Sequence, residues 1–174
     1  MQVLSLIVML VVLTLLGFRL HTHLAVHERR VVAAWDRLDT LLTQRNGLLQ
    51  QAYATAAHPH ASLCTVHTKV QDQERSRRRG DLPELADGER AIRSAWDRYI
   101  NEIIEESDSC QESLELTRRR VAALDQAISE ALSRYNAAVS AFTALRRHWV
   151  FGPLARLTGY TAFEPVGPPP PPEP

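Results

Sequence analysis

The amino-acid sequence predicts an all-α protein, with an N-terminal transmembrane helix followed by an elongated antiparallel bundle of three to four long helices. Three observations support this class. The chain begins with a long apolar run without charge, and the remainder is rich in the helix formers Leu, Ala, Arg, Glu and Gln. Apolar residues then recur at spacings of three and four. Pro and Gly fall in a few short breaks between these repeats.

The N-terminal run "MQVLSLIVMLVVLTLLGF" carries no charge through Phe18, and Arg19 closes it. At ~1.5 Å per residue the run is slightly shorter than the ~30 Å hydrocarbon core of a bilayer, and Leu20 with a snorkelling Arg19 completes the span. A cleaved signal peptide would need a basic n-region and a small-x-small cleavage site, which the sequence lacks. We therefore expect an uncleaved anchor over residues 1–20, with the span itself at about residues 2–18.

The charges around this run predict its orientation. Only Met1 and Gln2 precede it, whereas Arg19, Arg29 and Arg30 follow it and are expected to contact the membrane surface. By the positive-inside rule, the N-terminus lies outside and the helical domain lies in the cytoplasm of a single-pass protein of the cell membrane. An extracytoplasmic helical domain is the alternative.

The first bundle helix is expected from about Leu24 to Ala57, continuous with the membrane span. Arg45 occupies one position of its apolar face, and a buried guanidinium needs a partner, such as Asp125 or Glu130 on a facing helix or a carbonyl. Snorkelling of Arg45 to the rim of the bundle is the alternative. Pro59 ends the helix. The other positions of the face alternate in spacing between four and three: Val31, Trp35, Leu38, Leu42, Leu49, Ala52 and Ala56.

Two further helices are expected in the middle of the chain. One runs from Leu63 to Arg79, and "RSRRRGDLPELADG" at 75–88 is predicted to be a loop because it contains two glycines and a proline. The next helix starts near Glu89 and is interrupted by "EESDS". Ser109 and Glu112 then form a potential capping box. The stripe of this middle helix consists of Ile92, Trp96, Tyr99 and Ile103.

The last long helix, about Gln111 to His148, is the most regular. A heptad seam is formed by Val121, Ile128, Tyr135, Phe142 and Trp149, with Leu124, Ala131, Ala138 and Leu145 three residues after the first four. Gly152 and Pro153 end this helix, and a short helical turn from Leu154 to Thr158 closes at Gly159. We expect a bundle over residues 21–150, a helical cap over 151–165 and a disordered proline-rich tail over 166–174. A coiled coil that dimerises in trans is the alternative to a self-folded bundle.

Composition and motifs argue against several functional classes. Lys plus Arg and Asp plus Glu both number 20, so no overall field attracts nucleic acid. The sequence supports no Ser-His-Asp or Cys-His set and no Gly-rich phosphate loop, so we predict neither an enzyme nor a bound cofactor. Cys64 and Cys110 are too few for a disulfide framework and are not at zinc-site spacing, although one bridge between them stays open.

Membrane-proximal histidines suggest an alternative function. His21, His23 and His27 follow the apolar run, and the run Arg75–Arg79 is strongly basic. A lipid- or metal-binding sensor at the membrane surface could use both groups. The simpler interpretations are interfacial histidines and a solvated helix end whose charges compensate the helix dipole. A metal site also needs three or four converging ligands, and we predict none.

The C-terminal stretch "RYNAAVSAFTALRRHWVFGPLARLTGYTAFEP" resembles the signature of the LemA family. That signature is an Arg-Tyr-Asn stretch, a Val three residues on, an aromatic-Pro turn, a short Ala-rich helix, a Gly-aromatic pair and a terminal Phe-Glu. The matching residues are Arg134, Tyr135, Asn136, Val139, Ala155, Gly159, Tyr160, Phe163 and Glu164. The stretch "VVAAWDRLDTLLTQRNGLL" is similar to the family's first helix through Trp35, Leu38, Leu42, Arg45 and Leu48.

The resemblance implies a bacterial, membrane-tethered, elongated helical bundle, and it brings no catalytic residues. From the heptad position of Tyr135 we expect a buried ring whose hydroxyl needs a partner. Asn136, one step round the helix, is expected to bond a loop or a neighbouring helix. We expect a non-enzymatic scaffold or protein-interaction module at the cell membrane. Its protein partners are not identified by the sequence, and self-association stays open.

Overall fold

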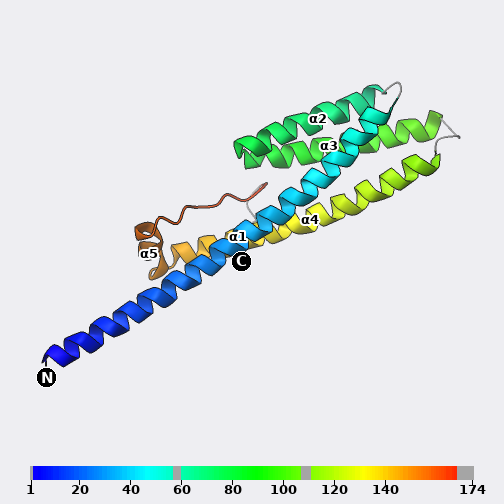
Figure 1. The fold of residues 1–174 in the computed structure, drawn as a ribbon. Helices are drawn as coiled ribbons and strands as arrows, with labels where there is room; N and C mark the ends of the chain where they lie inside the picture. Colours follow the sequence, from blue (N-terminus) through cyan, green and yellow to red (C-terminus); the bar gives the residue numbers. More distant parts are fainter. Residues whose placement is uncertain (1, 57–59, 107–110, 168–174) are drawn as a thin grey trace, which may run out of the picture.

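Five α-helices make up the described part of the chain, which comprises residues 2–56, 60–106 and 111–167 of the computed structural model (Figure 1). The helices are α1 (Gln2–Thr55), α2 (Ala61–Arg79), α3 (Leu82–Glu106), α4 (Gln111–Arg147) and α5 (Phe151–Leu157). No strand occurs among these residues. α1 packs along α4, α2 packs along α3, and α1 also contacts α2. The predicted all-α class and elongated bundle are confirmed.

α1 continues the apolar run into the bundle without a break, as predicted. The large apolar side chains between Leu4 and Phe18 are 50–69% exposed, whereas Leu24 and Val31 are fully buried. Among the described residues, α1 is the one helix long and apolar enough to cross a membrane, with a mean hydropathy of 2.2 over its most apolar 18 residues. One helix thus combines a candidate membrane span with a bundle helix.

The interior contains two apolar cores along the length of the bundle. We call them the proximal core and the distal core by their distance from the N-terminal run. The proximal core joins the part of α1 between Leu24 and Leu42 to α4 from Ile128 to Phe142, with Leu85 of α3, α5 and residues 160–166 packed against them. The distal core joins α1 at Leu49 to α2, α3 and the early part of α4 at Val121. The predicted apolar stripe of α3 is confirmed, because Ile92, Trp96 and Tyr99 are buried.

The connection between α2 and α3 is much shorter than predicted. Residues 75–88 are not a loop: they form the end of α2, a turn at Gly80, and the first part of α3. Gly80 has a left-handed φ of 74°, and the amide of Asp81 donates to the carbonyl of Ser76 at 3.1 Å, as in a Schellman motif. The turn therefore needs only two residues.

The residues that suggested a longer loop are accommodated inside α3. Pro83 lies in the first turn, where a helix can lack an N–H donor. The carboxylate of Asp81 accepts the amide of Glu84 at 3.2 Å. Gly88 lies within the helix at a close approach to α2, because a Cβ there would come 3.3 Å from Cγ of Gln73. Gly88 thus allows helix contact and does not end a helix.

The end of α4 also differs from the prediction. The heptad seam is buried at Val121, Ile128, Tyr135 and Phe142, but Trp149 is 82% exposed, because α4 ends at Arg147 and the chain turns there. α5 begins at Phe151, and Gly152 and Pro153 lie inside it rather than ending α4.

Two glycines explain the path of the chain after α4. A Cβ on Gly152 would come 2.9 Å from the carbonyl oxygen of Arg146, so a larger residue would force the turn apart. Gly159 has a φ of 77°, and Tyr160 donates its amide to the carbonyl of Ala155 at 3.0 Å, which confirms the predicted left-handed helix end. Val166, which we assigned to the tail, is 2% exposed and belongs to the fold. The predicted capping box at Ser109 and residues 168–174 lie outside the described residues.

Candidate functional site

A layer of polar side chains separates the two apolar cores. Each of the four long helices contributes to it: Arg45 and Asn46 from α1, Gln73 from α2, Glu89 from α3 and Asp125 from α4. We call these five residues the polar layer. Arg45 is 1% exposed, Asn46 is fully buried and Gln73 is 2% exposed. In each helix, a polar residue takes one position of the apolar stripe, and folding brings these polar residues together in one layer.

Arg45 is the centre of the polar layer. Its Nη1 and Nη2 donate to the two carboxylate oxygens of Glu89 at 2.5 and 2.7 Å, a two-point contact. Nη1 also reaches Oδ1 of Asp125 at 3.2 Å, and Nη2 donates to Oδ1 of Asn46 at 3.0 Å. Asn46 and Gln73 complete the layer through an Nδ2–Oε1 bond of 2.8 Å, and Gln73 also donates to Glu89.

The electrostatics of Arg45 follow from these contacts. Burial alone would lower the pKa of the guanidinium, but the hydrogen bonds and charge of Glu89, with those of Asp125, outweigh burial and raise it. Arg45 is therefore a permanent cation within the bundle. Such a group is tolerated only while its carboxylate partners are in place.

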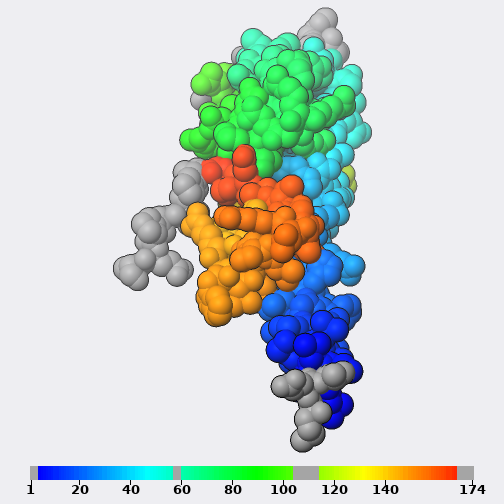
Figure 2. Space-filling model, turned by 90° about the vertical axis from the view of Figure 1, so that its left-hand side faces the viewer, coloured from blue at the N-terminus to red at the C-terminus, as the bar shows by residue number. Residues whose placement is uncertain are grey.

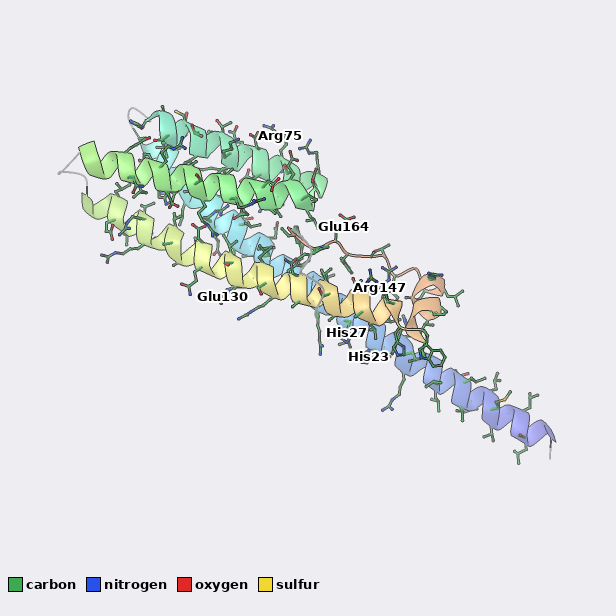
Figure 3. All side chains as sticks on the ribbon, turned by 180° about the vertical axis from the view of Figure 1, so that it is seen from behind. His23, His27, Arg75, Glu130, Arg147 and Glu164 are labelled. Atoms are coloured by element: carbon green, nitrogen blue, oxygen red, sulfur yellow. The ribbon has the colours of Figure 1, made fainter. Side chains whose placement is uncertain are left out.

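The predicted partners of Arg45 are partly correct. Asp125 is a partner, whereas Glu130 is exposed on the far side of α4 and lies 3.9 Å from Arg134 on its own helix (Figure 3). The principal partner, Glu89, was missed, as were Asn46 and Gln73. A usable signal was present, because Glu89 precedes Ile92 by three residues and Gln73 follows Val70 by three. Each of these polar residues thus continues an apolar stripe.

A groove opens between α3 and α4 beside the polar layer. It has a volume of about 900 Å³. Glu89 lines it from α3, while Ile128 and Leu132 line it from α4. Asn136 and Val166 lie at its proximal end. The groove exists because α3 packs mainly on α2 and α4 mainly on α1. It has the mixed apolar and charged lining that is common at protein-binding sites.

Tyr135 and Asn136 fasten the C-terminal segment, residues 158–167, onto α4. The Tyr135 hydroxyl donates to the carbonyl of Glu164 at 2.9 Å. The Asn136 amide donates to the carbonyl of Val166 and accepts its amide N–H, both at 3.0 Å. Burial raises the pKa of Tyr135, and the charge of Glu164 raises it further. The pair satisfies backbone groups of an extended segment that has no strand partner.

Most residues of the predicted signature meet around this fastening. The Trp35 and Tyr135 rings lie 5.5 Å apart, and the Phe163 ring meets Phe142 edge-on at 5.5 Å. Val139 is buried in the same core. Two signature residues lie elsewhere: Arg45 is in the polar layer, and Arg134 is exposed on the side of α4 that faces away from the core.

The membrane-proximal histidines do not converge on a shared centre. The His23 and His27 rings lie 4.9 Å apart (Figure 3). The ring of His21 lies instead 5.8 Å from that of Tyr160. Within the described ranges, no group of three or more His, Cys, Asp or Glu side chains could hold a metal ion. Burial lowers the pKa of His27, and His23 and Arg30 lower it further, so His27 is neutral at pH 7.

The Arg75–Arg79 run is largely occupied by ion pairs. Arg75 lies 3.2 Å from Asp72, and Arg79 lies 3.2 Å from Glu84. Arg77 crosses to α1, where its Nε is 3.3 Å from Asp39. This run therefore joins α2 to its neighbours. Cys110 lies outside the described residues, so the question of a bridge between Cys64 and Cys110 stays open.

No family model, curated protein or solved structure matches the chain. The LemA resemblance therefore rests on the quoted residues alone and stays a prediction. The groove between α3 and α4, bounded by the polar layer and the C-terminal segment, is the candidate functional site.

Proposed function

We propose that this protein is a non-enzymatic scaffold of LemA type, anchored in the cell membrane, whose groove between α3 and α4 receives a segment of a partner protein. The observation that carries the proposal is the continuity of α1. Exposed apolar side chains from Leu4 to Phe18 and the buried stripe from Leu24 lie on one unbroken helix. A membrane anchor without a linker would give the groove a fixed place relative to the bilayer.

The dimensions of α1 support a projecting scaffold. Between Arg19 and the end of α1 at Thr55, the helix extends about 50 Å at 1.5 Å per residue. Glu89, which lines the groove, lies about 40 Å along this length, because it pairs with Arg45, which follows Arg19 by 26 residues. A partner in the groove would thus be held well away from the headgroups, in the cytoplasm if the positive-inside rule applies.

The lining of the groove supports docking of a protein segment. Apolar contacts would come from Ile128 and Leu132, while Arg93, Asp97 and Arg98 form a charged border. Apolar anchors inside a polar rim are the usual arrangement of protein interfaces.

Photo-crosslinking tests the proposal. A photoreactive residue at Ser94 would lie in the groove, whereas the same residue at Glu130 would lie on the opposite, exposed side of α4. We expect crosslinks of one defined mass from Ser94 and not from Glu130, in the membrane fraction of cells that express the full chain. Equal adducts at both positions, or none at Ser94, would contradict a docking role for the groove.

A further inference from the structure

The turn between α4 and α5 packs on α1 where the apolar run ends. The rings of Phe151 and His23 lie 5.6 Å apart, and the Tyr160 hydroxyl lies 3.3 Å from Nδ1 of His21. Figure 2 shows this part of the chain, in orange, against the blue part of α1. We call residues 146–157 the α4–α5 corner. It lies at the level where α1 would leave the bilayer.

An apolar hollow with a cationic edge lies at this junction. It has a volume of about 680 Å³, and its apolar wall includes Leu16, Leu20 and Phe151. Arg19 and Arg30 lie on its edge and share one face of α1, because eleven residues are close to three helical turns. Since His27 is neutral at pH 7, the two guanidiniums supply the positive charge.

The charge of the two segments that meet here is one-sided. The whole chain has 20 basic and 20 acidic residues, but residues 1–27 and 131–163 contain no Asp or Glu. The same residues contain five arginines: Arg19, Arg134, Arg146, Arg147 and Arg156. Glu28 and Glu164 directly border these segments, and Arg29 and Arg30 follow Glu28, so basic residues still outnumber acidic ones at this end. The membrane-proximal end is therefore positive in a protein with no net charge, which complements an anionic surface.

Large apolar side chains of the α4–α5 corner face solvent. Trp149 is 82% exposed and Leu157 is 86% exposed, whereas Trp96 in the distal core is 3% exposed. Trp is enriched at membrane–water interfaces, where its ring can lie among the headgroups. An exposed Trp beside a cationic hollow is therefore consistent with burial in a bilayer surface.

We propose that the α4–α5 corner and the adjoining face of α1 form a docking site for anionic phospholipids of the bilayer. Arg19 binds the headgroup phosphate, because a guanidinium group forms two-point contacts with phosphate. Arg30 lies about 16 Å further along α1 and adds electrostatic attraction for an anionic lipid. The acyl chains continue along Leu16 and Leu20, and Trp149 inserts at headgroup level. This inference rests on the membrane anchoring in the proposed function. It adds a second attachment point that would set the tilt of the bundle.

Fluorescence quenching in vesicles tests the site with the full chain. Vesicles contain equal mole fractions of phosphatidylglycerol and phosphatidylcholine, with only one of the two lipids brominated. The emission of Trp149 is obtained by subtracting the emission spectrum of Trp149→Phe from that of the native chain. We expect brominated phosphatidylglycerol to quench this emission more than brominated phosphatidylcholine, because the anionic lipid is enriched at the site.

Paired variants assign the preference to the two arginines. In Arg19→Gln/Arg30→Gln, most of the difference in quenching between the two brominated lipids should be lost, because each arginine near an anionic surface accounts for about a fivefold preference. A difference as large as in the native chain would overturn the role of these two arginines. Arg119→Gln/Arg120→Gln removes the same charge from two exposed positions near the distal end of α4. This control should retain the native difference between the lipids.

The outcomes separate the lipid site from the anchor. Flotation of the protein with vesicles, combined with an unquenched Trp149, would overturn the lipid site and leave the anchor intact. Equal quenching by both lipids in the native chain would overturn the anionic preference. Failure to float with vesicles of either composition would overturn both the anchor and the lipid site.

Discussion

The proximal and distal cores of the bundle are closed in different ways. In the distal core, side chains of four helices surround the interior, and the tight turn at Gly80 holds α2 against α3. In the proximal core only α1 and α4 run side by side for a long distance. Its remaining cover comes from the start of α3 around Leu85, from α5 and from the C-terminal segment, which is not helical.

This difference shows why the polar residues are placed as they are. A pair of helices leaves part of each apolar stripe open, so another element must cover it. An extended segment can do so only if its backbone groups find partners, and Tyr135 and Asn136 provide them. The distal core needs no such fastening, because helices surround it. Apolar helix faces alone could shift along one another, and the contacts of the polar layer form in only one alignment of the four helices. This role of a buried polar group is best documented in coiled coils.

The largest effect is expected at the junction of the two cores. Arg45→Met removes the cation and leaves the buried Glu89 and the half-buried Asp125 without it. Loss of one partner of a buried ion pair costs about 3–5 kcal/mol, so both cores should lose stability together. Thermal unfolding followed by circular dichroism measures the loss, and hydrogen exchange shows whether both halves are affected.

A compensating variant sharpens this prediction. Arg45→Met/Glu89→Leu removes both main charges, and it should recover part of the lost stability because an apolar pair can replace a buried ion pair. A double variant no more stable than Arg45→Met would contradict the central role of the Arg45–Glu89 contact.

A smaller effect, confined to the proximal core, is expected from Asn136→Ala. The backbone N–H and carbonyl of Val166 would lose their partner. Leaving a buried polar group without a hydrogen bond costs about 1–3 kcal/mol of the free energy of unfolding. Limited proteolysis should then cleave the C-terminal segment sooner, with unchanged hydrogen exchange in α2. Asn101→Ala, at an exposed position on α3, is the matched control and should behave as the native chain. Equal effects at both asparagines would mean that Asn136 does not fasten the segment.

Tyr135→Phe should cost about 0.5–1.5 kcal/mol, because one hydrogen bond to Glu164 is lost while the ring still fits. It should also change the alkaline response. Burial raises the pKa of Tyr135, so the stability linked to its proton is complete below pH about 10 and is lost as pH rises through the raised pKa. The free energy of unfolding, measured by urea titration from pH 8 to 11, should therefore fall less steeply with pH in Tyr135→Phe than in the native chain. An unchanged slope would contradict the assignment.

The smallest effect is expected on the surface of α4. Glu115 pairs with Arg118 and Arg119, and these contacts lower the pKa of Glu115 to about 2. All three side chains contact water, so solvent screens the pair. Glu115→Gln should unfold at the same temperature as the native chain, within error, at pH 7. A clear loss of stability would mean that surface pairs matter as much as the buried layer.

The helical order could be predicted because it depends on local patterns. The stripe that includes Leu38 and Leu42, and the seam through Ile128 and Phe142, are periodic enough to define helices and their buried faces. Turns were less predictable. Pro83 and Gly88 are usual loop residues, but a first helical turn and a close helix contact accept them equally well.

The candidate site was predictable only in part, because it is built from long-range contacts. Arg45 was identified as buried from its place on one stripe, and Asp125 as a partner, but Glu89 became visible only when α3 was placed against α1. The groove depends on the space left between α3 and α4. Trp149 was wrongly predicted to be buried: it continues the heptad spacing, but the helix ends two residues before it.

Cysteine labelling tests the central claim most directly, that α1 anchors the bundle in the membrane with the bundle in the cytoplasm. In a chain with both native cysteines replaced by serine, Leu10→Cys lies in the apolar run and Ser133→Cys on the exposed surface of α4. With a membrane-impermeant thiol reagent, Ser133→Cys should react only after the cells are permeabilised, and Leu10→Cys should react in neither condition. Labelling of Leu10→Cys in permeabilised cells would contradict the anchor, and labelling of Ser133→Cys in intact cells would contradict the cytoplasmic placement.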